Sequence, residues 1–134
     1  MLRQDDFQKS QLVLTGWRWG KQYGGHLAAC MIMSCLMNRV RLGWGTVLEV
    51  LDKIPNFAAT TEMPTGTPAI WEPGFVRLLH EVEGIYDGTN DHSNGALYWC
   101  DTRDVSTPFF KEKILGQSEV HRRVMEMNTL ALFV

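Results

Sequence analysis

The chain has 134 residues, a length that suits a single domain able to bury a hydrophobic core without staples such as disulfides. Hydrophobic residues make up 45% of the sequence, which excludes a disordered chain. The formal net charge of −2 gives no electrostatic basis for binding nucleic acid or an anionic membrane, so neither is expected as a partner.

The N-terminal part predicts a first helix from Asp5 to about Trp19. Asp5 and Asp6 stand near its start, where the helix dipole favours acidic side chains. The next segment, Trp17–Gly25, combines three aromatic residues, two cations and three glycines. We expect a bend or a shortened helix whose residues face a groove. The alternative is that the aromatic rings close one end of the core.

An apolar run dominates the segment His26–Val40 and predicts a central helix. From Leu27 to Met37 only Ser34 carries a polar side chain, so no face of the segment suits water. Eleven residues rise about 16 Å as a helix, too little to span a bilayer, so we expect the buried helix of a soluble domain. The Ala, Met and Leu content disfavours a strand. Residues that suit a helix C-terminus follow: Arg39, Arg41 and Gly43.

Helical spacing of apolar residues returns within Gly43–Ile54. Thr46 is the expected N-cap, and Glu49, three residues later, completes a capping box. Pro55 marks the end of this helix. The following stretch, Asn56–Ala69, contains threonines and prolines with little periodicity, and predicts an irregular loop that lines a site.

The pattern becomes helical again between Glu72 and Gly84. Pro73 suits the first turn and Gly84 a C-terminal stop. Glu81 and Glu83 are expected on the solvent face, and His80 is interpreted as a partly buried histidine with satisfied hydrogen bonds rather than a ligand.

Turn-forming residues fill Asp87–Gly95. A calcium loop is disfavoured because His92 stands where the sharp turn of such a loop needs glycine, so a plain turn is expected. Ala96–Trp99 reads as a short strand, and Thr129–Val134 as a strand that pairs with it.

Two short helices are expected between these strands. Thr107 and Pro108 open the first, which Gly116 closes. Ser118 can cap the second, with apolar residues on one side: Val120, Val124 and Met127. The predicted fold is therefore α+β and mainly α, a single domain over residues 1–134 with a buried central helix and a small antiparallel sheet.

Sequence motifs for cofactor chemistry are not found. The spacing of the four histidines fits no zinc motif, and no nucleophile, Walker or dinucleotide pattern is present, so we expect no metal and no other cofactor. Cys30 and Cys35 lie five apart on one helix and cannot bridge, so these thiols and Cys100 are expected to be reduced and mostly buried. The first residues lack a signal-peptide core, so we expect a cytoplasmic protein whose action elsewhere needs release by another route.

Two motifs stand in a characteristic order along the chain. The apolar helix ends in Asn38-Arg39-Val40, and Gly95-Ala96-Leu97-Tyr98 follows later, before a further segment near the C-terminus. This arrangement, over roughly Leu14 to Phe133, resembles the SleB-type cell wall hydrolases, which are spore-cortex-lytic and phage-associated murein hydrolases.

The resemblance implies a lysozyme-like fold and cleavage of peptidoglycan between N-acetylmuramic acid and N-acetylglucosamine. In this family a protonated glutamic acid donates its proton to the glycosidic oxygen. In lytic transglycosylases the sugar's own hydroxyl then closes an anhydro ring, so one carboxyl suffices.

The expected glutamate is missing from this chain. The family's acidic position falls near Trp19 or Gly20, and no Asp or Glu occurs between Asp6 and Glu49. Glu62, in the irregular loop, and Glu72, beside Trp71, are the replacement candidates, while Glu49 is assigned to the capping box.

Three hypotheses follow. The first is a murein glycosidase or transglycosylase with a relocated acid. The second is a non-catalytic protein that binds glycan or a protein partner through four stacking residues: Trp19, Tyr23, Tyr98 and Trp99. The third is a structural subunit that associates with itself or with phage structural proteins, which an exposed apolar patch favours.

Overall fold

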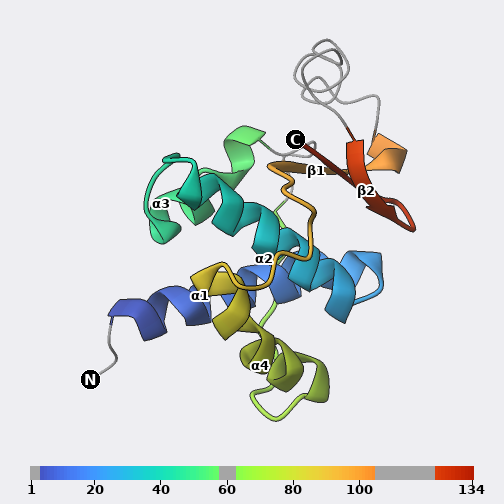
Figure 1. Ribbon diagram of the computed structural model, residues 1–134. Coiled ribbons are helices and arrows are strands. Elements are labelled where there is room, and N and C mark those ends of the chain that lie inside the picture. Colours follow the sequence, from blue (N-terminus) through green and yellow to red (C-terminus); the bar gives the residue numbers. More distant parts are fainter. Residues whose placement is uncertain (1–3, 58–62, 105–122) are drawn as a thin grey trace.

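The computed structural model describes residues 4–57, 63–104 and 123–134 (Figure 1). The helices are α1 (Gln4–Gly20), α2 (His26–Arg41), α3 (Val47–Asp52) and α4 (Pro73–Asp87). The strands are β1 (Tyr98–Asp101), β2 (Arg123–Met127) and β3 (Leu130–Phe133). Short 3₁₀ turns cover Lys21–Tyr23, Ile54–Phe57 and Thr102–Asp104. The described part is mainly helical with a three-stranded antiparallel sheet, which confirms the predicted class.

Helix α2 lies at the centre of the molecule (Figure 1). Every residue from Ala28 to Met37 is buried, which confirms the prediction, although Leu27 at its start is half exposed. Helices α1, α3 and α4 and strand β1 all contact α2. Within the described residues, no helix has both the length and the apolar character needed to cross a membrane.

Helices α1 and α2 approach each other closely through glycines, and the chain turns between them. A Cβ on Gly20 would lie 2.7 Å from the backbone nitrogen of Ala29. Gly24 and Gly25 then adopt φ values of 100° and 104°, which glycine reaches without a steric penalty. The turn Lys21–Tyr23 lies between, so the predicted bend is confirmed.

The start of α3 forms as predicted. The hydroxyl of Thr46 accepts a hydrogen bond from the Glu49 backbone N–H at 3.3 Å. The Glu49 carboxylate accepts one from the Thr46 N–H at 3.2 Å, so the capping box is complete.

Helix α4 differs from prediction at its C-terminal end. Pro73 occupies the first turn as expected, but the helix continues through Gly84 to Asp87, and Gly88 with φ 88° ends it. A Cβ at Gly84 would lie 2.4 Å from the side-chain nitrogen of Asn90. Gly84 therefore leaves room for the side chain of Asn90 in the returning chain and does not end the helix.

Two side chains of α4 also lie elsewhere than predicted. Glu83 is exposed as expected, and its carboxylate pairs with the Lys9 ammonium at 2.9 Å. Glu81 is half buried, because it follows Leu78 by three residues and shares its inward face. His80 is exposed, so the prediction of a partly buried histidine was wrong.

The sheet has the strand order β1-β3-β2. Strand β3 pairs antiparallel with β1, with Tyr98 opposite Phe133, which confirms that the C-terminal strand pairs with the strand near Trp99. Val124 and Met127 were expected on a helix but belong to β2, which pairs with β3 through a turn at Asn128. Pairing with β3 outweighs the helical spacing. The helix predicted from Thr107 to Gly116 and the start of the next at Ser118 lie outside the described residues.

A buried arginine joins α2 to the sheet. Arg39 is 1% exposed, and its Nε donates a hydrogen bond to the Leu97 carbonyl at 2.7 Å. Its guanidinium carbon lies 4.9 Å from the ring centre of Trp99 and 5.2 Å from that of Trp44. Burial lowers the pKa of Arg39 from its usual value. The aromatic faces and the carbonyl compensate for part of the lost hydration of the charge.

The close approach of α1 and α2 can be tested with Gly20→Ala. The added methyl group would overlap the backbone of Ala29, which cannot move like a side-chain tip, so we expect a loss of about 1–3 kcal/mol of unfolding free energy. Urea unfolding followed by circular dichroism measures it. Gly74→Ala is the control, because its Cβ would meet no atom nearer than Glu72 Oε1 at 4.0 Å. If Gly20→Ala and Gly74→Ala are equally stable, Gly20 is not in close contact with the Ala29 backbone.

The role of Arg39 can be tested with Arg39→Met. This change leaves the Leu97 carbonyl without the Nε donor and removes the contacts with the rings, so we expect a loss of about 2 kcal/mol in unfolding free energy. Thermal and urea unfolding measure this loss. Arg123→Met, which breaks an exposed pair with Glu126, should cost about 0.5 kcal/mol or less. A stability of Arg39→Met equal to that of the wild type would show that these contacts of Arg39 do not stabilise the fold.

Candidate functional site

A cavity of about 130 Å³ opens where α1 ends, α2 begins and α4 begins. We call it the Trp17 cavity. Its lining combines an aromatic ring, a cation, an imidazole and a carboxylate with small and apolar residues. The lining residues are Trp17, Lys21, Gly25, His26, Ala29, Glu72, Gly74 and Leu78. Both alternatives for the segment Trp17–Gly25 are thus met in part, since Trp17, Lys21 and Gly25 line a cavity while Trp19 and Tyr23 are buried in the core.

Glu72 brings a carboxylate into the Trp17 cavity. It occupies the N-cap position of α4 but makes no side-chain cap hydrogen bond. Instead its Oε1 accepts a hydrogen bond from the indole Nε1 of Trp17 at 3.3 Å. Its backbone N–H donates to the Ala69 carbonyl at 2.9 Å, which holds the turn before the helix. Glu62, the other replacement candidate, lies outside the described residues.

Two cations tie the irregular loop to the end of α1. The Lys21 ammonium donates a hydrogen bond to the Thr65 carbonyl at 2.7 Å and lies 4.5 Å from the ring centre of Trp17. Arg18 Nε donates to the Gly66 carbonyl at 2.7 Å. Thr65 and Gly66 are thus held next to Trp17 and Lys21, but none of the described loop residues 63–69 is among the residues that line the Trp17 cavity.

The four predicted stacking residues do not line this cavity. Trp19, Tyr23 and Trp99 are 3%, 4% and 5% exposed, and the rings of Trp19 and Trp99 pack edge to face with centres 5.4 Å apart. Tyr98 is half buried, with its ring centre 5.7 Å from that of Trp44. Such core positions leave little ring surface for a sugar.

Trp17 is the aromatic residue that sequence reasoning left out of the stacking set. The buried residues of α1 recur at three- and four-residue spacing: Leu12, Val13, Gly16, Trp19 and Gly20. Trp19 lies within that face, whereas Trp17, four residues after Val13, lies at its edge and is half buried.

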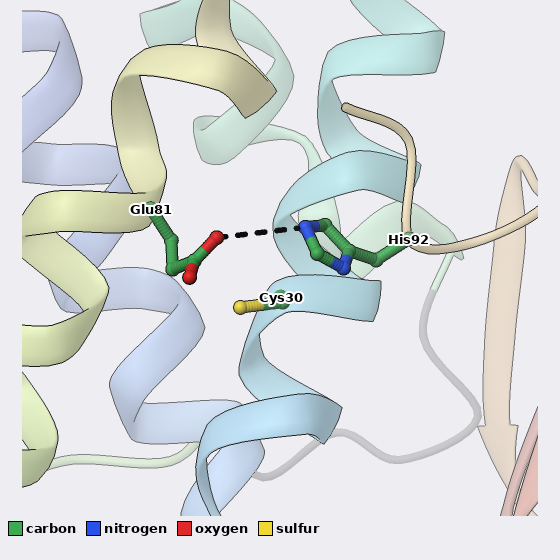
Figure 2. A group of neighbouring side chains, drawn as sticks. All are labelled: Cys30, Glu81 and His92. Carbon is green, nitrogen blue, oxygen red and sulfur yellow. Dashed lines mark ion pairs between the residues drawn. The ribbon is translucent and has the colours of Figure 1, made fainter. Parts of the chain in front are cut away.

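A second group of polar side chains lies beside α2. Cys30 of α2, Glu81 of α4 and His92 of the following loop point toward one another (Figure 2). Each offers a possible metal-ligating atom, and these three atoms lie within 4.8 Å of one another. His92 Nε2 lies 3.8 Å from Glu81 Oε2. We call Cys30, Glu81 and His92 the Cys–Glu–His cluster.

His26 connects the Trp17 cavity to the Cys–Glu–His cluster. It precedes Cys30 by one helical turn, and its Nε2 lies 3.8 Å from Cys30 Sγ. His26 Nδ1 and His92 Nε2 are buried and have no hydrogen-bond partner among the described residues. Sequence reasoning missed the cluster because its members come from three segments, although His26 and Cys30 share a helix face.

The loop that carries His92 is anchored on α2. Its backbone N–H donates a hydrogen bond to the Ser34 hydroxyl at 3.0 Å. The Asp91 carboxylate accepts hydrogen bonds from the Ser93 N–H at 2.8 Å and the Gly95 N–H at 2.9 Å. Asn38 Nδ2 donates to Asp91 Oδ2 at 3.2 Å. These bonds fix the place of the imidazole.

Burial sets the protonation of Cys30 and of the neighbouring His26. Burial, and next the negative charge of Glu81, raise the pKa of the Cys30 thiol to about 11. Burial, and next the charge of Arg77, lower the pKa of His26. At neutral pH the free thiol therefore holds its proton, and the His26 imidazole is neutral.

Comparisons of the chain with protein-family models, with curated proteins and with solved structures find no match. The resemblance to the SleB-type hydrolases therefore depends on the motifs described above, and any activity has to be proposed from those motifs together with the geometry.

The anchor of the His92 loop predicts an acid-dependent stability. Burial alone would raise the pKa of Asp91, but its hydrogen bonds from the loop and from Asn38 outweigh it and hold the pKa below 3.8. A lowered pKa means that the carboxylate stabilises the fold above about pH 4, and that this stability is lost as pH falls through the folded-state pKa.

We therefore expect Asp91→Asn to be less stable at neutral pH and to show a flatter loss of stability between about pH 5 and pH 2. Urea unfolding across that range measures the slope. Ser93→Ala, which removes the hydroxyl donor to the carboxylate and keeps the backbone N–H donor, should give an intermediate slope. If the unfolding free energies of wild type and Asp91→Asn depend on pH in the same way, the ionised Asp91 carboxylate does not stabilise the fold.

Proposed function

We propose that the chain is a lysozyme-like protein that binds the glycan strands of peptidoglycan at the Trp17 cavity and cleaves them with Glu72 as proton donor. The observation that carries the proposal is the position of the Glu72 carboxylate, held by the indole N–H of Trp17 inside that cavity. The resemblance places the family's acid in the segment that leads into the central helix. Glu72 reaches the same region from the start of α4.

The two motifs that carry the resemblance contact each other. Asn38 Nδ2 donates a hydrogen bond to the Ala96 carbonyl at 3.0 Å, and Arg39 Nε donates to the Leu97 carbonyl. A motif on the central helix thus holds the motif at the start of β1. Such mutual contact supports a shared scaffold, since unrelated short matches have no reason to meet in space.

The proposed chemistry needs one carboxyl group. Protonated Glu72 would donate its proton to the glycosidic oxygen as oxocarbenium character develops on the departing sugar. In the transglycosylase reaction a hydroxyl of the same sugar then attacks the anomeric carbon and loses its proton to the carboxylate, which restores the acid. The Trp17 N–H orients the carboxyl, and the Trp17 ring offers an apolar wall.

Binding without cleavage is the second candidate, and Trp71 favours it. This residue stands next to Glu72 and is 80% exposed, so its ring can stack on a sugar without any proton transfer. The cavity volume of about 130 Å³ is below the roughly 300–1,000 Å³ of typical ligand pockets, which suits contact with part of a glycan. Ile70, 74% exposed beside Trp71, extends an apolar surface that a self-contact or a phage structural protein could also cover.

A turbidity assay on purified peptidoglycan tests cleavage. We expect slow lysis by the wild type and a loss of about 10²–10⁴-fold in rate for Glu72→Gln, because an amide cannot donate the proton. Glu126→Gln, on the exposed face of β2, is the control with unchanged lysis. Mass spectrometry of the products distinguishes anhydro ends from reducing ends. If Glu62→Gln abolishes lysis instead, the assignment of Glu72 is wrong.

Sedimentation with murein tests binding in the same samples. Wild type and Glu72→Gln should both sediment with peptidoglycan, and Trp71→Ala should sediment less. Sedimentation without lysis supports the binding candidate alone. A wild-type chain that neither lyses nor sediments with peptidoglycan would overturn both.

A further inference from the structure

We propose that the Cys–Glu–His cluster binds one divalent transition-metal ion, with Zn²⁺ as the best fit, through Cys30 Sγ, a Glu81 carboxylate oxygen and a His92 ring nitrogen. A thiolate, an imidazole and a carboxylate are the ligand types that zinc combines. The three come from α2, α4 and the loop after α4, and they converge on one point (Figure 2).

The spacing of the ligand atoms supports this assignment. In a tetrahedral zinc site, bond lengths of about 2.0–2.3 Å place neighbouring ligand atoms about 3.3–3.6 Å apart. Here His92 Nε2 and Glu81 Oε2 are 3.8 Å apart, and the three ligand atoms lie within 4.8 Å of one another. Binding would therefore require the three side chains to move together by about 1 Å or less.

A hydrogen bond does not explain why Glu81 and His92 lie close together. At 3.8 Å, Glu81 and His92 are too far apart for a hydrogen bond. His92 Nε2 is nevertheless buried and has no hydrogen-bond partner in the described part of the chain, and its contact with Glu81 is an ion pair only when the imidazole is protonated. A buried polar atom left in this way is costly, and a metal ion would satisfy it.

The charges of the three side chains and the hydrogen bonds that hold the His92 loop also fit a zinc site. The carboxylate of Glu81 and a thiolate at Cys30 would balance the two positive charges of zinc, while Arg77 nearby is exposed and screened by water. The bond from the His92 N–H to Ser34 and the anchor at Asp91 already hold the loop in place. Next to the cluster, His26 Nε2 lies 3.8 Å from the Cys30 sulfur.

Zinc binding would displace the proton of the Cys30 thiol into the solvent, and the sulfur would bind as thiolate. The ion would cross-link α2, α4 and the loop, so it should stabilise the folded chain. This role is independent of the reaction proposed at Glu72.

Calorimetry on the tag-free chain, stripped with a chelator, tests the proposal with zinc alone. We expect one Zn²⁺ per chain, release of a proton measured in buffers of different ionisation enthalpy, and a higher melting temperature. Co²⁺ in place of zinc should show a thiolate-to-cobalt absorption band. Cys30→Ser, Glu81→Gln and His92→Gln should each weaken zinc binding by about tenfold or more.

Matched controls exist for each ligand type. Cys35→Ala changes a buried free cysteine of the same helix, and His80→Gln and Glu83→Gln change exposed residues of α4. Each should bind zinc within about twofold of wild type. Circular dichroism of the metal-free variants verifies folding. If Cys30→Ser does not fold, Glu81→Gln and His92→Gln carry the comparison, since their side chains are partly exposed. Substoichiometric zinc, a cobalt spectrum without the thiolate band, or equal affinities in ligand and control variants would overturn the site.

Discussion

Burial of α2 is the constraint on which the rest of the structure depends. From Ala28 to Met37 the helix is enclosed, so each polar group it carries must find a partner inside the protein. Ser34 accepts from His92, and Arg39 donates to Leu97. These few polar contacts select which loop and which strand pack against the helix, whereas apolar contacts alone would tolerate several arrangements. The hydrophobic run thus determines where the helix lies, and its few polar residues determine its neighbours.

The fold was predictable where local chemistry decides the structure. The capping box at Thr46, the proline at the start of α4 and the apolar run of α2 each act within one or two turns, and all three were predicted correctly. Prediction was wrong where a distant segment decides. Gly84 packs against Asn90 instead of ending a helix, and Val124 joins a strand because β3 lies beside it. No periodicity within a single segment contains that information.

In the candidate sites too, local features were predictable from the sequence and contacts between distant segments were not. Glu72 is a candidate from the sequence because few carboxylates can replace the missing acid. Its contact with Trp17 depends on how α4 packs against α1 and could not be predicted. Glu81 was assigned to the solvent face, and its closeness to Cys30 and His92 depends on the rotation of α4 against α2. The half-buried position of Glu81 follows from the three-residue step after Leu78, a step that the apolar pattern of the segment could have indicated.

The two candidate sites share the N-terminal half of α2, and the packing explains why. The C-terminal half of the helix donates hydrogen bonds from Asn38 and Arg39 to the segment that leads into β1, so little of this half lines a cavity. The N-terminal half meets α1 through glycines and meets α4 at its first turns, which leaves space beside His26. His26 lines the Trp17 cavity on one side and contacts Cys30 on the other. An ion held at the Cys–Glu–His cluster would therefore lie next to one wall of the cavity that Glu72 also lines.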